Sequence, residues 1–299
     1  MSRLNKTFFA IISACISINL VFVSSASAVS SSDWRAGRII DDTVFMNKND
    51  MSVPQIQQFL ESKMTSCDTN GNGYYNGVRR SQYGSSVGNP PPFTCLRDYK
   101  EVPKTTPGNW IPESNYGRTD GWAPAGSKSA AELIWDAAQT YNINPKVLLV
   151  TLQKESGLVT DDWPLKRQLT YAMGAHCPDS GPGGSANCDI NYSGFSMQIR
   201  ESAELFRYYL DNMDQPWWTN KKPFRHNTIQ YDVETSCGSS SVYMETRATT
   251  ALYVYTPYQP SDAALAAGYG TAEPCGAYGN RNFWLYYNDW FGPTLDRSF

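Results

Sequence analysis

The chain has 299 residues and a formal net charge of −3, from 25 basic and 28 acidic residues. A weakly acidic chain is poorly suited to nucleic acid or an anionic membrane surface as its main partner, but the charge is compatible with a neutral sugar polymer. The length accommodates one domain or two. Aromatic residues make up 13% of the chain, which suits carbohydrate binding because sugar rings pack on aromatic faces.

The first 28 residues have the pattern of a secretory signal peptide. Arg3 and Lys6 give a positive start, an apolar run follows from Phe8 to Val23, and Ala26-Ser27-Ala28 offers a small-residue cleavage site. The run is short for a bilayer span, so we predict export and cleavage and not a transmembrane anchor. The expected location is extracellular or in the cell envelope, with no stable membrane insertion after cleavage. A lipoprotein box ending at Cys15 is a weaker alternative, because apolar sequence continues beyond it.

Cleavage would leave six cysteines, and an even number in an exported chain indicates a disulfide framework. Many connectivities are open to six cysteines. Pairing of nearest neighbours is the simplest, because each pair then closes one loop-rich segment. The predicted bridges are Cys67–Cys95, Cys177–Cys188 and Cys237–Cys275.

No metal or cofactor is predicted. Asp68 to Gly73 matches the opening half of an EF-hand calcium loop, but Arg79 stands where a bidentate Glu is required. His176 and its neighbouring cysteines match no zinc spacing. His176 and His226 are the only histidines of the chain, and bridged cysteines cannot act as thiolates. A Cys or Ser nucleophile would need a His base, so these facts weigh against a papain-like cell-wall amidase.

The composition divides the chain near residue 122. Residues 29–122 are predicted to form a small, irregular N-terminal module, with one short helix between Asp50 and Met64 and then a stretch rich in Gly, Pro, Asn, Ser and Tyr. Residues 123–299 show helical periodicity and few alternating strands, so the fold class is predicted to be mainly α. Helices are expected at 129–141, 145–156, 199–212 and 246–255, and the aromatic tail at 281–291 should contribute to the core.

The clearest helical signal ends in a carboxylate. Asn144 is a favourable N-cap, Pro145 suits the first helical position, and Gly157 is a natural stop. Within this helix Glu155 falls on the same face as Leu152, a face that otherwise points into the core. The alternative is that Glu155 lies at the edge of that face and is merely solvated.

Three segments together resemble the lysozyme-like fold of soluble lytic transglycosylases and goose-type lysozymes. They are NPKVLLVTLQKESG at 144–157, GFSMQI at 194–199 and ATTALYVYTP at 248–257. The resemblance spans roughly residues 129 to 260 and implies a lysozyme-like domain within 123–299. It implies that Glu155 is the general acid, and that the substrate-binding residues are Ser156, Gly194, Met197, Gln198 and Tyr255.

The resemblance implies cleavage of peptidoglycan, or of a related amino-sugar polymer, in its glycan strands. The acid must hold a proton near neutral pH, and we expect Leu152 and Leu158 to favour this by partial burial of Glu155. A route in which the substrate's own N-acetyl group assists needs no second carboxylate and gives 1,6-anhydro products. If a second carboxylate takes part, the candidates are Asp161, Asp162, Asp189 and Glu201.

The sequence is also compatible with two other functions. One is a non-catalytic carbohydrate-binding protein, of the haemagglutinin-like kind, on the same scaffold. The other is a structural secreted protein in which Glu155 is incidental. Three tryptophans in polar loop contexts are candidates for a sugar groove, although burial is the ordinary role of such residues: Trp163, Trp217 and Trp218.

Overall fold

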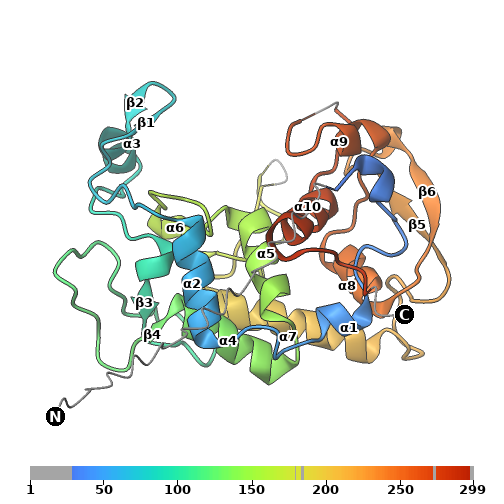
Figure 1. Cartoon of the computed structure of the whole chain (residues 1–299), viewed down its shortest axis with the longest axis horizontal. Coiled ribbons are helices and arrows are strands. Elements are labelled where there is room, and N and C mark those ends of the chain that lie inside the picture. The colour runs from blue at the N-terminus through green and yellow to red at the C-terminus, as the bar shows by residue number, and fades with distance from the viewer. Residues whose placement is uncertain (1–28, 179, 183–184, 272–273, 297–299) are drawn as a thin grey trace, which may run out of the picture.

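A computed structural model describes residues 29–178, 180–182, 185–271 and 274–296 (Figure 1). Of the residues that the structure describes, 41% are helical and 8% lie in strands, which confirms the prediction of a mainly α protein. The predicted signal segment, residues 1–28, lies outside the described residues. Within the described ranges, no helix combines the length and the apolar character needed to cross a bilayer.

The described part of the chain folds into helices and short two-stranded antiparallel ribbons. The helices are α1 (Asp42–Phe45), α2 (Val53–Lys63), α3 (Arg80–Ser86), α4 (Ala130–Tyr141), α5 (Pro145–Ser156), α6 (Lys166–Thr170), α7 (Phe195–Asn212), α8 (Arg247–Tyr255), α9 (Asp262–Ala266) and α10 (Gly279–Phe291). The paired strands are β1 (Tyr74–Tyr75) with β2 (Val78–Arg79), β3 (Lys100–Glu101) with β4 (Lys128–Ser129), and β5 (His226–Gln230) with β6 (Ser239–Tyr243).

Helix α5 lies at the centre of the molecule. The Asn144 side chain accepts a hydrogen bond from the Lys146 amide at 2.9 Å, and Gly157 ends the helix at φ 74°. All residues from Val147 to Gln153 are buried, which is typical of a helix surrounded by protein on every side. Helices α4, α7 and α10 pack around it (Figure 1). The predicted bounds of this helix are confirmed.

Capping signals also located other helices. The predicted capping box at Ser129 precedes α4, and the Thr246 side chain caps α8. Helix α7, however, begins at Phe195 and not at the predicted Ile199. The reason is a long-range cap, because the Glu101 carboxylate accepts hydrogen bonds from the amides of Phe195 and Ser196 at 3.3 and 2.7 Å. A cap supplied by a distant strand leaves no local signal in the sequence.

The predictions lacked helix α10 and the ribbon β5–β6, among other elements. The aromatic tail does enter the core, with Phe283 and Tyr287 buried, but it does so as the regular helix α10, whose start has no side-chain cap. Strands β5 and β6 pair with Asn227 opposite Val242 and Ile229 opposite Ser240. Only one residue in each of these two strands, Ile229 or Val242, is buried, so the ribbon lacks the alternation by which a strand is recognised.

The N-terminal third contributes to the main core before it becomes irregular. Ile39, Phe45, Ile56 and Leu60 are buried in the same apolar cluster as the residues of α4, α5 and α7. The following stretch, 67–122, holds mostly turns, and its elements β1, β2 and α3 stand away from the helical core (Figure 1). The division of the chain at residue 122 stays a prediction.

The three disulfides join the residues that nearest-neighbour pairing predicted. Their Cα–Cα distances are 5.9 Å for Cys67–Cys95, 3.8 Å for Cys177–Cys188 and 5.3 Å for Cys237–Cys275. The first bridge encloses β1, β2 and α3, the elements that stand away from the helical core.

Candidate functional site

Glu155 is the point at which the central helix reaches the surface. Its side chain is 29% exposed, whereas the side chain of Lys154 is only 3% exposed. The Lys154 ammonium donates a hydrogen bond to a Glu155 carboxylate oxygen and another, at 2.8 Å, to Thr256 Oγ1. The sequence predicted an apolar surrounding for this carboxylate, and the structure places a buried ammonium against it.

Tyr255 lies beside this charged pair. Lys154 Nζ is 5.3 Å from the centroid of its ring. The Tyr255 hydroxyl donates a hydrogen bond to the Met173 carbonyl at 2.7 Å and lies 3.1 Å from Ser202 Oγ. Burial, and then the nearby negative charge of Glu155, raise the pKa of Tyr255 well above its ordinary value. The hydroxyl therefore stays protonated, and the structure brings Tyr255 and Glu155 together around Lys154.

Gln198 is buried one turn into α7, and its amide is fully used by the fold. Its Oε1 accepts hydrogen bonds from the amides of Met173 and Ala175 at 3.3 and 3.1 Å. Its Nε2 donates to the carbonyls of Ala175 and Tyr192, both at 2.9 Å. These bonds fix the loop that follows α6 onto α7. A direct contact of Gln198 with substrate stays a prediction.

The other predicted substrate contacts are also engaged within the fold. Gly194 has φ 103°, and an added Cβ would lie 2.6 Å from Pro112 Cγ, so only glycine fits there. Met197 is fully buried. Ser156 Oγ donates a hydrogen bond to the Leu152 carbonyl at 2.9 Å. Their roles in substrate binding stay predictions.

A cavity of about 480 Å³ adjoins the end of α5, and we call it the aromatic cavity. Gly157, two residues beyond Glu155, forms part of its lining, together with the rings of Tyr75, Tyr83 and Trp163. The Tyr75 ring centroid lies 4.8 Å from that of Tyr83 and 5.4 Å from that of Trp163. Trp163 was predicted to lie at a groove. The two tyrosines were missed, because they belong to a stretch that otherwise indicates only turns.

One arginine joins the two sides of the aromatic cavity. Arg80 Nη1 lies 2.8 Å from Asp162 and 3.1 Å from Asp68, and its guanidinium is 5.2 Å from the Trp163 ring centroid. The Asp68 amide also donates to the Asp162 carbonyl at 2.6 Å. The segment that carries Tyr75 is thereby attached to the segment that follows α5.

The segment from Asp68 to Gly73, which resembles the start of a calcium loop, forms a hydrogen-bonded turn. The Asp68 carboxylate accepts hydrogen bonds from the amides of Asn72 and Gly73, at 2.7 and 2.8 Å, as well as from Arg80. Burial alone would raise the pKa of Asp68, but the bonds from Gly73, Asn72 and Arg80 outweigh it and lower the pKa. The carboxylate thus holds a turn. Among the described residues, no group of three or more His, Cys, Asp or Glu is placed to bind a metal.

The four candidate second carboxylates have different surroundings. Asp161 is the one that lines the aromatic cavity, where it accepts a hydrogen bond from Gln168 Nε2 at 2.8 Å. Asp162 pairs with the arginine described above. Asp189 caps a 3-10 turn, and Glu201 lies 3.1 Å from an imidazole nitrogen.

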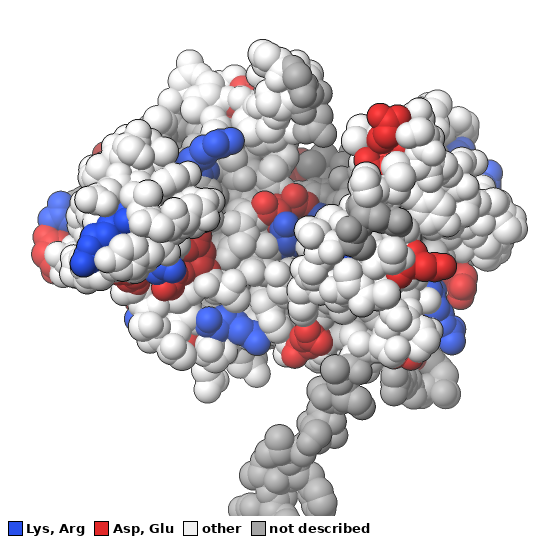
Figure 2. Space-filling view, turned by 90° about the horizontal axis from the view of Figure 1, so that it is seen from above, with Lys and Arg blue, Asp and Glu red and all other residues white. Residues whose placement is uncertain are grey.

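The two remaining tryptophan candidates follow α7. Trp217 is 56% exposed, whereas Trp218 is buried and donates its indole N–H to the Lys221 carbonyl at 2.9 Å. Burial is thus the role of Trp218 in the fold. Seen from above, the molecule is hollowed between raised parts, and acidic and basic atoms lie together on the floor of the hollow (Figure 2).

The fold and the site define a helix-rich, disulfide-bonded protein with an exposed carboxylate two residues before Gly157, which lines the aromatic cavity. Residues 38–204 match the family model described as LasA, N-terminal domain. The match covers more than half of the chain, so the protein belongs to this family. It includes Glu155 and the aromatic cavity, but not Tyr255. No curated protein and no solved structure matches the chain.

The matched family is different from the lysozyme-like superfamily. The prediction that the three segments indicate a lysozyme-like domain was therefore wrong. A helix that ends in Glu-Ser-Gly follows from capping, and a buried Gln near the start of α7 follows from the need to hold a loop. Neither feature by itself requires a lysozyme-like fold. The LasA family is one of secreted proteins that act on peptidoglycan, and the matched model describes an N-terminal domain.

Proposed function

We propose that this protein acts on peptidoglycan by cutting its glycan strands, with Glu155 as the general acid. The observation that supports this is the exposed carboxylate at the end of a buried helix, two residues before Gly157, which lines a cavity with three aromatic rings. Sugar rings pack on aromatic faces. A carboxyl group beside a glycosidic oxygen supplies the proton that bond cleavage requires.

The proposal gives Lys154 a defined part in the cycle. A general acid must present its proton to the glycosidic oxygen, whereas the Lys154 ammonium occupies one oxygen of the Glu155 carboxylate in this structure. Thr256 Oγ1 already accepts a hydrogen bond from the same Nζ. We propose that Lys154 keeps this second bond and leaves Glu155 when a sugar enters the hollow.

The test is digestion of purified peptidoglycan followed by mass analysis of the products. Glu155→Gln keeps the shape of the side chain but removes the proton donor, so the rate should fall by about a hundredfold or more. Glu113→Gln, a matched change of an exposed glutamate, should leave the rate unchanged. Digestion by the Glu155→Gln protein at the wild-type rate would place the acid elsewhere.

The products separate two chemical routes. If the substrate assists its own cleavage, the fragments will end in 1,6-anhydro sugars. If water attacks instead, they will carry reducing ends, and Asp161→Asn should then lower the rate, because Asp161 is the candidate second carboxylate that lines the aromatic cavity.

Sugar binding without cleavage is the second candidate, and the ammonium held against Glu155 favours it. In that case the wild-type protein will sediment with peptidoglycan but release no soluble fragments.

A further inference from the structure

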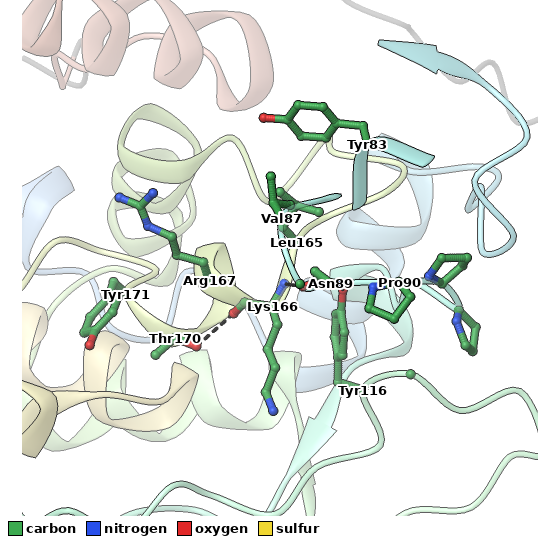
Figure 3. Close-up of a pocket in the computed structure, with 14 residues that line it drawn as sticks. Tyr83, Val87, Asn89, Pro90, Tyr116, Leu165, Lys166, Arg167, Thr170 and Tyr171 are labelled. Atoms are coloured by element: carbon green, nitrogen blue, oxygen red, sulfur yellow. Dashed lines mark hydrogen bonds between the residues drawn. The ribbon is translucent and has the colours of Figure 1, made fainter. Parts of the chain in front are cut away.

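A second and larger cavity, of about 720 Å³, lies next to the aromatic one, and we call it the proline cavity (Figure 3). Pro90, Pro91 and Pro92 form one side of it, and helix α6 forms another. Tyr83 and Leu165 line both cavities, so the two share a wall. A ligand that occupies the aromatic cavity therefore has a second site within reach.

The charged residues that line the proline cavity are all basic. Lys166 and Arg167, the first residues of α6, both line it and are exposed, and none of the 14 lining residues is acidic. Figure 3 shows the two side chains leaving the helix in different directions, with Lys166 alongside Tyr116. Within the part of the chain that the structure describes, neither side chain has an ion-pair or hydrogen-bond partner. Arg80 and Lys154, by contrast, are both paired.

The walls of the proline cavity are fixed by hydrogen bonds. Asn89 Nδ2 donates to the Tyr116 hydroxyl at 2.8 Å, and that hydroxyl donates to the Pro164 carbonyl at 2.8 Å. The Lys166 amide donates to Asn89 Oδ1 at 2.6 Å. Burial raises the pKa of Tyr116 to about 12, so the hydroxyl remains a donor at neutral pH. The cavity is thus preformed, and its two cations are available to a ligand.

We propose that the proline cavity binds the acidic peptide stem that peptidoglycan glycan strands carry, while the aromatic cavity receives a sugar ring. Carboxylates of the stem pair with Lys166 and Arg167, and its backbone and apolar groups pack on prolines and tyrosines. The volume falls in the range of pockets that hold small ligands. The assignment rests on the proposed function, because that function places the glycan strand beside Glu155.

The test is calorimetric titration of the purified protein with two probes. One is the N-acetylglucosaminyl-N-acetylmuramyl disaccharide with its peptide stem, and the other is the same disaccharide without peptide. Wild type should bind the first more tightly. The double variant Lys166→Gln/Arg167→Gln should weaken that binding by about fivefold and leave the peptide-free probe unaffected, because exposed charge pairs contribute modestly. The matched control is Arg225→Gln, which removes an exposed cation beside β5 and should change neither affinity.

Salt gives an independent readout, because pairing between exposed charges is screened and the preference for the peptide should shrink as ionic strength rises. The proposal is overturned if wild type binds both probes alike, if the double variant weakens both equally, or if salt leaves the preference unchanged. Peptide preference without glycan cleavage would refute the proposed function but support peptide binding in the proline cavity. Glycan cleavage that depends on Glu155, without peptide preference, would support the proposed function but refute peptide binding in the proline cavity.

Discussion

The two walls of the aromatic cavity are held in place by different forces. The wall at Gly157 continues from α5, whose residues Val147 to Gln153 are buried among three other helices. The wall at Tyr75 and Tyr83 belongs to the segment between Cys67 and Cys95, which stands away from the core. Packing therefore fixes the proposed acid, whereas one cross-link, ring contacts with Trp163 and a few polar contacts fix the rings that we propose to face a sugar.

This difference has a functional consequence. A protein can keep its overall stability while the second wall moves, because local stability need not follow global stability. Changes in the core should weaken folding and binding together. Changes in the second wall should reduce sugar binding before they unfold the molecule.

The largest effect is expected from the central helix. Leu148 is fully buried, so Leu148→Ala should leave a cavity and lower the free energy of unfolding by about 2–5 kcal/mol. Val233→Ala, at a residue that is 73% exposed, should change it by about 0.5 kcal/mol or less. Denaturant titration measures both. Equal, small losses would show that α5 is not the stabilising centre.

The second prediction compares two disulfides. Removing Cys67–Cys95 or Cys237–Cys275 by paired Cys→Ser changes should cost about 2–4 kcal/mol in each case, because both bridges close loops of similar length, with sequence separations of 28 and 38. Only the first should weaken binding of the peptide-free disaccharide, since that bridge encloses Tyr75 and Tyr83. If both variants bind the sugar as wild type does, the aromatic cavity is not the sugar site.

The smallest effect on stability is expected from lowering the pH. The lowered pKa of Asp68 means that its contribution to stability is present above the ordinary value of 3.8 and is lost as pH falls through the lower folded-state value. Asp68→Asn should therefore show a shallower decline in stability below pH of about 4. Asp262→Asn, at an exposed position, should follow the wild-type curve. Denaturant midpoints between about pH 2 and 6 provide the comparison.

The sequence predicted well those features that local residues determine. Asn144, Pro145 and Gly157 were enough to set the ends of α5, and cysteine order was enough to pair the bridges. The start of α7 was misplaced because its cap comes from Glu101, a residue distant in the sequence. The ribbon β5–β6 was missed because each strand buries a single residue.

The candidate site was predicted only in part, for a similar reason. Glu155 and Trp163 carried local signals, a helix end and a polar loop. The contact of Lys154 with Glu155 was not foreseen, because helical neighbours in sequence point apart and the lysine is held by Thr256 from a different element. The proline cavity is lined by residues near 90, 116 and 166, which come from three separate segments. No sequence pattern within one segment predicts that the three lie together.

Gln198 and Tyr255 hold opposite ends of the same residue, since one accepts from the Met173 amide and the other donates to the Met173 carbonyl. Two anchors on one residue do not act independently. Once either hydrogen bond is removed, the loop can shift and the remaining bond contributes less to stability. Substitutions of Gln198 and Tyr255 are therefore thermodynamically coupled, and their effects on the free energy of unfolding are not additive. A single substitution at either position would thus misstate how firmly this loop is tied to the helices on which it rests.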